Sequence, residues 1–198
     1  MTTMPAPTTP VRPVEVEEFL TGDFPVGSEL VDGVVHLNDP AFLHQEVVSR
    51  LLQALAAWTR TEPGHGRAGF GGNWVLAGRN VYKPDVWWAA EPPRGTRHAG
   101  PPELAVEVRS PGTWALDVGP KLRRYEAAGT AELWLVDPPA WTVLVFRRAA
   151  GSGTAGSGTA GAGAAGFGTA LEVAGGDLTS PLLPGFALPV TDLVEDAG

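Results

Sequence analysis

The sequence contains no cysteine among its 198 residues, which excludes disulfide bonds and thiolate metal ligands and favours a reducing compartment. It also lacks any apolar run near the length of about 18 residues that a membrane-spanning helix needs. Residues 1–13 are rich in proline and threonine and have no apolar stretch, unlike a signal peptide. We therefore expect a cytoplasmic protein that has no membrane partner.

Charge is scarce as well, because charged residues make up 18% of the chain and the formal net charge is −8. Such an acidic chain is poorly suited to neutralising nucleic-acid phosphates. One region departs from this trend: residues 94–124 hold six basic and three acidic residues, a local net charge of +3. The basic residues are Arg94, Arg97, Arg109, Lys121, Arg123 and Arg124.

Apolar residues, glycine and proline are abundant. The hydrophobic share of 43% and the seven tryptophans favour a globular domain, while 26 glycines and 19 prolines indicate many turns. We expect residues 1–13 to be a disordered arm and residues 14–198 to form a single domain. Residues 151–170 are four near-copies of five residues, GSGTA, GSGTA, GAGAA and GFGTA. This insert, at about 149–169, is expected to be a flexible hairpin tip without a function of its own.

The spacing of apolar residues predicts both helices and strands. Apolar residues recur every three or four positions from Phe42 to Thr59, which predicts the longest helix. A short helix is expected at 14–20 and another from Thr113 or Asp117 to residue 128, where Pro120 is tolerable only in the first turn. Strands are expected within 28–37 as a hairpin, then at 68–76, 86–90, 104–108, 133–136 and 142–146. Residues 91–101 are expected to be a loop, and residues 182–193 to pack on the domain. This order predicts an α+β fold with a mixed β-sheet.

Two carboxylates stand near the ends of neighbouring apolar runs, Asp85 just before residues 86–90 and Glu107 within residues 104–108. Mg²⁺ prefers oxygen ligands and is usually bound through one or two protein carboxylates. A bound ion can polarise a phosphoryl group and lower the pKa of a coordinated water. Taken alone, Asp85 is better explained as a turn residue and Glu107 as half of a salt bridge. Together with Lys121 they indicate a metal-assisted site that cleaves phosphodiester bonds.

Lys121 and Arg109 compete for the basic role in such a site. Arg109 shares a strand face with Glu107 and can hold a phosphate, but it cannot release its proton. Lys121 can orient or deprotonate a water or stabilise transition-state charge, although a solvated helix lysine explains it equally well. It lies one helical turn before Tyr125, so the two side chains can face the same way. We therefore favour Lys121 for catalysis and Arg109 for a phosphate contact or a salt bridge.

Glu29 is a third candidate carboxylate, but on its own it is better explained as a strand-edge residue. The four histidines lack the paired spacing of a zinc site; they are His36, His44, His65 and His98. His44 is interpreted as a packing residue near the start of the long helix. No Gly-x-Ser-x-Gly element supports a serine hydrolase.

Several segments together resemble the Uma-two (Uma2) family of bacterial restriction endonucleases, in the PD-(D/E)xK nuclease superfamily. The resemblance covers about residues 14–195 apart from the insert. Its segments are SELVDG at 28–33, His44, KPDV at 83–86, PPELAVEVRSP at 101–111, D-x-x-x-K-x-x-x-Y-x-x-x-G at 117–129, AELWLVDP at 131–138 and LPGFALPVTDL at 183–193. The run from 102 to 138 is the most specific of these.

The resemblance implies a restriction-endonuclease-like fold, a mixed β-sheet flanked by helices, and a Mg²⁺- or Mn²⁺-dependent DNA endonuclease. It implies that Asp85 and Glu107 bind the metal, that Lys121 is the migrated catalytic lysine and that Glu29 assists. Substrate contacts are then expected from Arg109, Arg123, Arg124 and Tyr125. A homodimer would suit the cutting of two strands.

Two alternatives remain open. One is a non-catalytic nucleic-acid-binding or regulatory protein that keeps the fold, which the acidic charge and the arginine at position 109 favour. The other is a metal-dependent phosphoesterase that acts on small nucleotides. A close cluster of Asp85, Glu107 and Lys121 that reaches a cleft favours an enzyme, whereas wide separation of the three excludes the nuclease.

Overall fold

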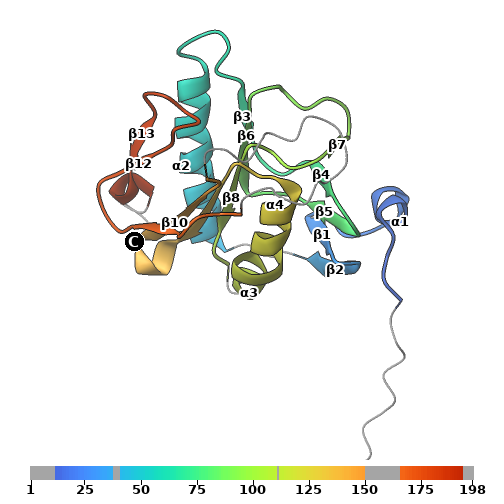
Figure 1. Ribbon diagram of the computed structural model, residues 1–198. Helices are drawn as coiled ribbons and strands as arrows, with labels where there is room; N and C mark the ends of the chain where they lie inside the picture. The colour runs from blue at the N-terminus through green and yellow to red at the C-terminus, as the bar shows by residue number, and fades with distance from the viewer. Residues whose placement is uncertain (1–11, 38–40, 111, 150–165, 194–198) are drawn as a thin grey trace, which may run out of the picture.

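The computed structural model describes residues 12–37, 41–110, 112–149 and 166–193. The N-terminal arm expected at 1–13 and the insert expected at about 149–169 lie largely outside these ranges. Helices and strands follow one another in the predicted mixed α+β arrangement, although the strands form more than the one sheet expected. Figure 1 shows two of the helices, α2 (Phe42–Thr59) and α4 (Leu122–Ala128), on opposite sides of the central strands.

The central sheet has six strands in the order β11–β10–β9–β8–β6–β3. Their bounds are β3 Arg67–Gly69, β6 Val86–Ala89, β8 Leu104–Val108, β9 Glu132–Asp137, β10 Thr142–Arg147 and β11 Leu171–Val173. Strands β8 and β9 pair in parallel, and their neighbours pair antiparallel, so the sheet is mixed. Strands β9 and β10 form the second hairpin that the sequence predicts.

A second sheet has five strands in the order β2–β1–β5–β4–β7. Their bounds are β1 Ser28–Val31, β2 Val34–Leu37, β4 Asn73–Leu76, β5 Asn80–Tyr82 and β7 Arg97–Ala99. The turn between β1 and β2 has φ of 50° at Asp32 and 83° at Gly33. Positive φ at both central residues is the geometry that an Asp-Gly pair favours, so the predicted hairpin is confirmed.

The remaining elements lie around the two sheets. They are α1 Val16–Thr21, α3 Trp114–Leu116, the π-helix η1 Asp117–Lys121, the 3-10 helices η2 Pro138–Ala140 and η3 Val190–Leu193, and the strand pair β12 Asp177–Thr179 and β13 Ala187–Pro189. Helix α2 has the predicted bounds, and the C-terminal segment packs on the domain as expected. No helix in the described ranges is long and apolar enough to cross a membrane.

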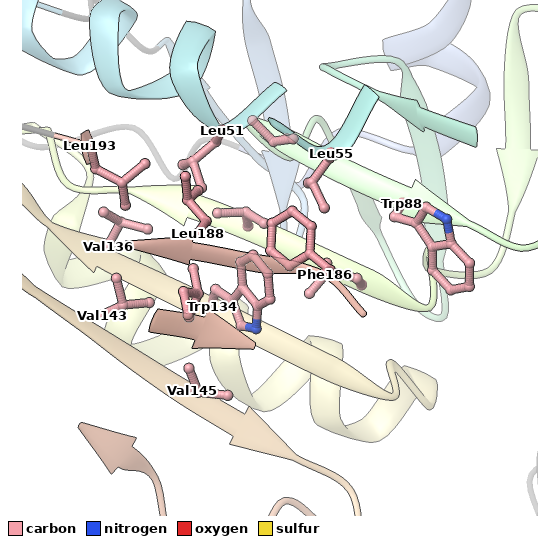
Figure 2. Packing of buried hydrophobic residues seen from close by; sticks show 14 of the residues in the cluster. Leu51, Leu55, Trp88, Trp134, Val136, Val143, Val145, Phe186, Leu188 and Leu193 are labelled. Atoms are coloured by element: carbon pink, nitrogen blue, oxygen red, sulfur yellow. The ribbon is translucent and has the colours of Figure 1, made fainter. Parts of the chain in front are cut away.

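The central strands bury side chains on both faces because helices cover both. On one face Val106, Val108 and Trp134 pack with the α2 stripe of Val47, Leu51, Leu55 and Trp58 and with the C-terminal segment. Figure 2 shows Leu51 and Leu55 near Trp134 and Phe186, whose rings stack at 6.1 Å. On the other face Ala105, Leu133 and Leu135 pack against Tyr125 of α4 and residues of the second sheet. Strand residues of alternating orientation thus serve two cores.

Three local predictions are wrong. Residues 68–76 are not one strand, because Gly71 and Gly72 have positive φ and the chain passes from β3 to β4 in the other sheet. The loop expected at 91–101 contains β7, and β5 was not anticipated. Pro120 does not lie in the first turn of a helix, since the helical segment begins at Trp114 and Pro120 sits inside the π-helix.

Candidate active site

Asp85 and Glu107 face each other across two paired strands. Val86 of β6 pairs with Val106 of β8 in antiparallel register, so the next position outward brings Asp85 opposite Glu107. The Asp85 carboxylate confirms this closeness, because its Oδ2 accepts a hydrogen bond of 2.8 Å from the Val108 backbone N–H. The two residues expected to act together therefore lie on neighbouring segments of the sheet, Asp85 directly before β6 and Glu107 within β8.

Glu107 is buried on the face that α4 covers, because Val106 and Val108 occupy the opposite face. Its side chain is 4% exposed. The Tyr125 hydroxyl donates a hydrogen bond of 2.7 Å to Glu107 Oε1, and Lys121 Nζ lies 2.8 Å from the same oxygen. One carboxylate oxygen is thereby held by two partners.

Lys121 is the centre of a group of carboxylates. Its ammonium lies 3.0 Å from Glu29 Oε2, 2.8 Å from Glu107 Oε1 and 3.3 Å from Asp117 Oδ1. Glu29 comes from β1 of the second sheet, so the ammonium joins the two sheets to the helical segment. The ring of Tyr82 lies 5.5 Å from the ammonium on another side. We refer to Glu29, Asp85, Glu107, Asp117 and Lys121 as the carboxylate–lysine cluster.

The π-helix explains how two cluster residues reach this point from one short segment. Pro120 has no N–H and cannot complete a regular α-helical turn. The Leu122 N–H instead reaches back five residues to the Asp117 carbonyl, which widens the turn. Asp117 and Lys121 are four positions apart, and both are buried. The Thr113 hydroxyl donates a hydrogen bond of 3.1 Å to Asp117 Oδ2. Wide turns of this kind recur at functional sites.

Burial and unequal charge perturb the pKa values in the cluster. Burial raises the pKa of Glu107 well above its ordinary value; Lys121 opposes this rise, while Asp117, Glu29 and Asp85 add to it. Burial likewise raises the pKa of Asp117. Burial alone would lower the pKa of Lys121, but Glu107, Glu29 and Asp117 outweigh it and raise that pKa well above its usual range. In the metal-free protein Lys121 is therefore an ammonium ion at neutral pH.

The donor set suits a hard divalent cation. Three carboxylates contact the Lys121 ammonium and the charge of Asp85 also acts on Glu107, so an added cation would offset the excess negative charge. The hydrogen bonds to Asp85 fall on Oδ2 and the one to Glu107 falls on Oε1, so each has a second oxygen that accepts none from the described part of the chain. Within those ranges no three His, Cys, Asp or Glu side chains form a ready-made metal cage. The fit is thus to two protein carboxylates, with the remaining ligands drawn from water and substrate.

Two residues of the site were not assigned to it from the sequence. His44 Nε2 lies 3.1 Å from Asp85 Oδ2, and the His44 side chain is 4% exposed. A signal was present, because His44 is three residues before Val47 and so continues the buried stripe of α2 as a polar member. Asp117 is expected from the sequence to be a helix cap. Its spacing of i, i+4 from Lys121 was also a signal, because residues four positions apart lie on one face of a helix.

The residues expected to contact substrate lie in different settings. Arg109 Nη1 is 2.7 Å from Asp137 Oδ2, and its guanidinium lies 5.7 Å from the centre of the Trp114 ring. Arg124 is exposed and pairs with Asp32 at 2.7 Å, and Arg123 is exposed beside it on α4. Tyr125 is fully buried and donates its hydroxyl to Glu107, so it positions that carboxylate from within the core.

The cluster reaches solvent mainly at Asp85, whose side chain is 15% exposed, against 3% for Lys121. A cavity of about 530 Å³ lies elsewhere, beside Leu52, Ala56 and Phe70 on α2 and after β3. This apolar cavity contains none of the cluster residues, and we assign the chemistry to the charged cluster because reaction at a phosphate needs charge and metal ligands.

A mixed sheet between helices, with carboxylates and a lysine gathered beside it, defines a restriction-endonuclease-like fold. The chain belongs to the Uma2 family, whose model is described as "Putative restriction endonuclease" and matches residues 17–190. It is similar to a crystal structure from Anabaena variabilis ATCC 29413 described as "a putative nuclease belonging to DUF820". The TM-score is 0.73 at 18% identity over 91% of this chain and 97% of that chain, which shows a shared fold. No curated protein matches the chain.

Proposed function

We propose that the protein is a Mg²⁺-dependent DNA endonuclease that hydrolyses phosphodiester bonds. The observation that carries this proposal is the carboxylate–lysine cluster, in which Asp85 directly precedes β6, Glu107 lies on the paired strand β8, and Lys121 Nζ lies 2.8 Å from Glu107 Oε1. Membership of the Uma2 family supports a nuclease as the class of enzyme. The choice of DNA as substrate and of Mg²⁺ as metal is part of the proposal.

In this proposal Asp85 and Glu107 hold Mg²⁺, or Mn²⁺ in its place. Such an ion supplies Lewis acidity and a water of lowered pKa. Asp85 is held by the Val108 N–H and by His44, and Glu107 by the Tyr125 hydroxyl, so both carboxylates are oriented before the metal arrives. Fixed ligands of this kind reduce the reorganisation that catalysis requires.

Lys121 acts through its positive charge. In the metal-free protein the surrounding carboxylates raise the pKa of Lys121, which favours its ammonium form at neutral pH. Its ammonium stabilises negative charge that develops on the phosphoryl group and opposes the rise in the pKa of Glu107 that burial causes. Glu29 assists by accepting two hydrogen bonds from Nζ, at 3.0 and 3.2 Å, which fix the position of the ammonium.

Arg109, Arg123 and Arg124 are the proposed phosphate contacts. Arg123 is exposed, whereas Arg109 and Arg124 would exchange a carboxylate partner for a phosphate. Duplex binding is weaker when each arginine must first give up a carboxylate partner. Arg97 is paired in the same way, with Glu17 at 2.7 Å. This pairing favours one alternative, a phosphoesterase acting on small nucleotides, which needs fewer phosphate contacts than a duplex does.

Plasmid nicking tests the proposal. Supercoiled DNA is incubated with the purified chain and Mg²⁺ or Mn²⁺, and the wild type is compared with Asp85→Asn, Glu107→Gln and Lys121→Met. Each substitution nearly preserves volume, and we expect each to reduce the rate by about 100-fold or more. Glu103→Gln is the matched control, because Glu103 is an exposed acid directly before β8 and its replacement should leave the rate unchanged.

Nicking that survives all three cluster substitutions would refute the assignment. A parallel assay with bis(p-nitrophenyl) phosphate separates the alternatives. Hydrolysis of this small diester without nicking, lost in the same three variants, would identify a small-substrate phosphoesterase. If the wild type neither nicks the plasmid nor hydrolyses the small diester, a non-catalytic protein that retains the fold is favoured.

A further inference from the structure

His44 is a buried polar residue for which the proposed chemistry above supplies no function. It is the third residue of α2 and the first member of the helix's buried stripe, where the other members are apolar. Burying an imidazole among apolar neighbours costs free energy unless its polar atoms are hydrogen-bonded. A leucine would fill the stripe at lower cost, so packing alone does not explain the histidine.

The contact of His44 with Asp85 has a defined direction. The distance from Nε2 to Asp85 Oδ2 is 3.1 Å, and an ionised carboxylate can only accept a hydrogen bond. Nε2 must therefore carry the proton. Nδ1 is buried and has no hydrogen-bond partner in the described ranges, which suits a bare lone pair better than a second N–H.

Two donors consequently converge on one oxygen of Asp85. The Val108 N–H approaches Oδ2 from β8 at 2.8 Å, and the His44 imidazole approaches it from α2. Neither donor alone fixes the rotation of the carboxylate, because an aspartate side chain rotates about two bonds. Together they hold Oδ2 against the protein and leave Oδ1 for another partner.

We propose that His44 is a positioning residue that fixes the Asp85 carboxylate for metal binding through an Nε2–H···Oδ2 hydrogen bond. This inference rests on the proposed function, because it takes Asp85 to be a metal ligand. The donor comes from α2, on the face of the sheet opposite α4, so the site is joined to both helical layers. Groups that orient a metal ligand typically change metal affinity by about 10- to 100-fold when they are lost.

Titration of the substrate-free protein with Mn²⁺, followed by electron paramagnetic resonance, measures this effect without activity. His44→Gln places an amide N–H near the position of Nε2, whereas His44→Asn is too short to reach Oδ2. We expect His44→Asn and His44→Leu to bind Mn²⁺ about 10-fold more weakly than the wild type, and His44→Gln to bind within about threefold of it. His98→Leu is the matched control, since His98 packs on Trp74 in the second sheet and should leave the affinity unchanged.

The outcomes separate this inference from the proposed function. Wild-type protein that takes up no Mn²⁺ would overturn both. Equal affinities for the wild type, His44→Asn and His44→Gln would overturn only the function of His44. If His44→Leu does not fold, the Asn and Gln variants decide the matter. A long-range ¹H–¹⁵N spectrum gives an independent reading: a proton on Nε2 of metal-free wild type supports the hydrogen bond, and a proton on Nδ1 alone overturns it.

Discussion

Replacing Lys121 by methionine tests the electrostatic account of the cluster most directly. The side chain is 3% exposed, and its ammonium is the common partner of Glu29, Glu107 and Asp117. Methionine nearly preserves the volume but leaves three buried carboxylates without their cation. Removing one partner from a buried ion pair costs about 3–5 kcal/mol. For a domain of this size such a loss lowers Tm by roughly 6–20 °C, which calorimetry in metal-free buffer at pH 8 resolves.

The pH dependence of this loss is a second signature. The raised pKa of Lys121 means that its stabilisation is fully present below about pH 10.5 and disappears only as the pH rises through the folded-state value. In Lys121→Met the carboxylates lose the charge that lowered their pKa values, so the folded variant binds protons more tightly. Its stability should therefore rise as the pH falls from 8 to 5, and the difference from the wild type should shrink.

Lys83 is a matched control, because Lys83 and Lys121 are the only lysines in the sequence. Partial burial lowers the pKa of Lys83 despite the attraction of Glu29, so its charge contributes no stability. Lys83→Met should change the free energy of unfolding by less than about 0.5 kcal/mol. Equal stability of Lys121→Met and the wild type at pH 8 would refute the described cluster, as would a loss that does not vary with pH.

Further substitutions test other residues of the site and, for comparison, the core on the other face of the sheet. Tyr125→Phe removes the hydroxyl that donates to Glu107 and should cost about 1–3 kcal/mol in urea unfolding; no loss would contradict that hydrogen bond. Burial raises the pKa of Glu107, so wild-type stability falls as the pH rises above about 4.5, and metal-free Glu107→Gln should become the more stable protein by pH 8 in thermal unfolding. Leu55→Ala, in the core on the other face, should cost about 2–5 kcal/mol, and a pH-dependent loss there would show that the cluster effects are not local.

Periodicity and turn chemistry explain which parts of the fold were predictable. Helix α2 follows from apolar spacing alone because its stripe faces one core, and the hairpin at Asp32 follows from the need for positive φ. The sequence pattern predicts one strand over β3 and β4 because their break lies at Gly71 and Gly72, where a bulge and a change of sheet give the same glycine signal. Strand β5 spans three residues, too few for a period of two to emerge.

The candidate site was predictable where residues share a ladder or a helix face. Asp85 directly precedes β6, Glu107 lies within the paired strand β8, and Lys121 precedes Tyr125 by one turn, so strand pairing and helical spacing bring these residues near one another. The contact of Lys121 with Glu29 spans 92 positions and depends on how the two sheets pack, which no local pattern contains. The same holds for His44, whose partner Asp85 lies 41 positions away, directly before β6.

Metal binding would explain why the protein retains a cluster of buried charges that destabilises the metal-free fold. A buried carboxylate whose pKa is raised destabilises the folded chain at neutral pH, and apolar residues of similar volume would often serve stability better. Lys121 offsets only part of that cost, since one ammonium is shared by three carboxylates. The remaining imbalance is what a divalent cation would relieve, so the same charges that weaken the metal-free fold would strengthen metal binding. Stability gained on Mg²⁺ addition should accordingly be larger for the wild type than for Glu107→Gln, because the neutral amide removes both the cost and the attraction.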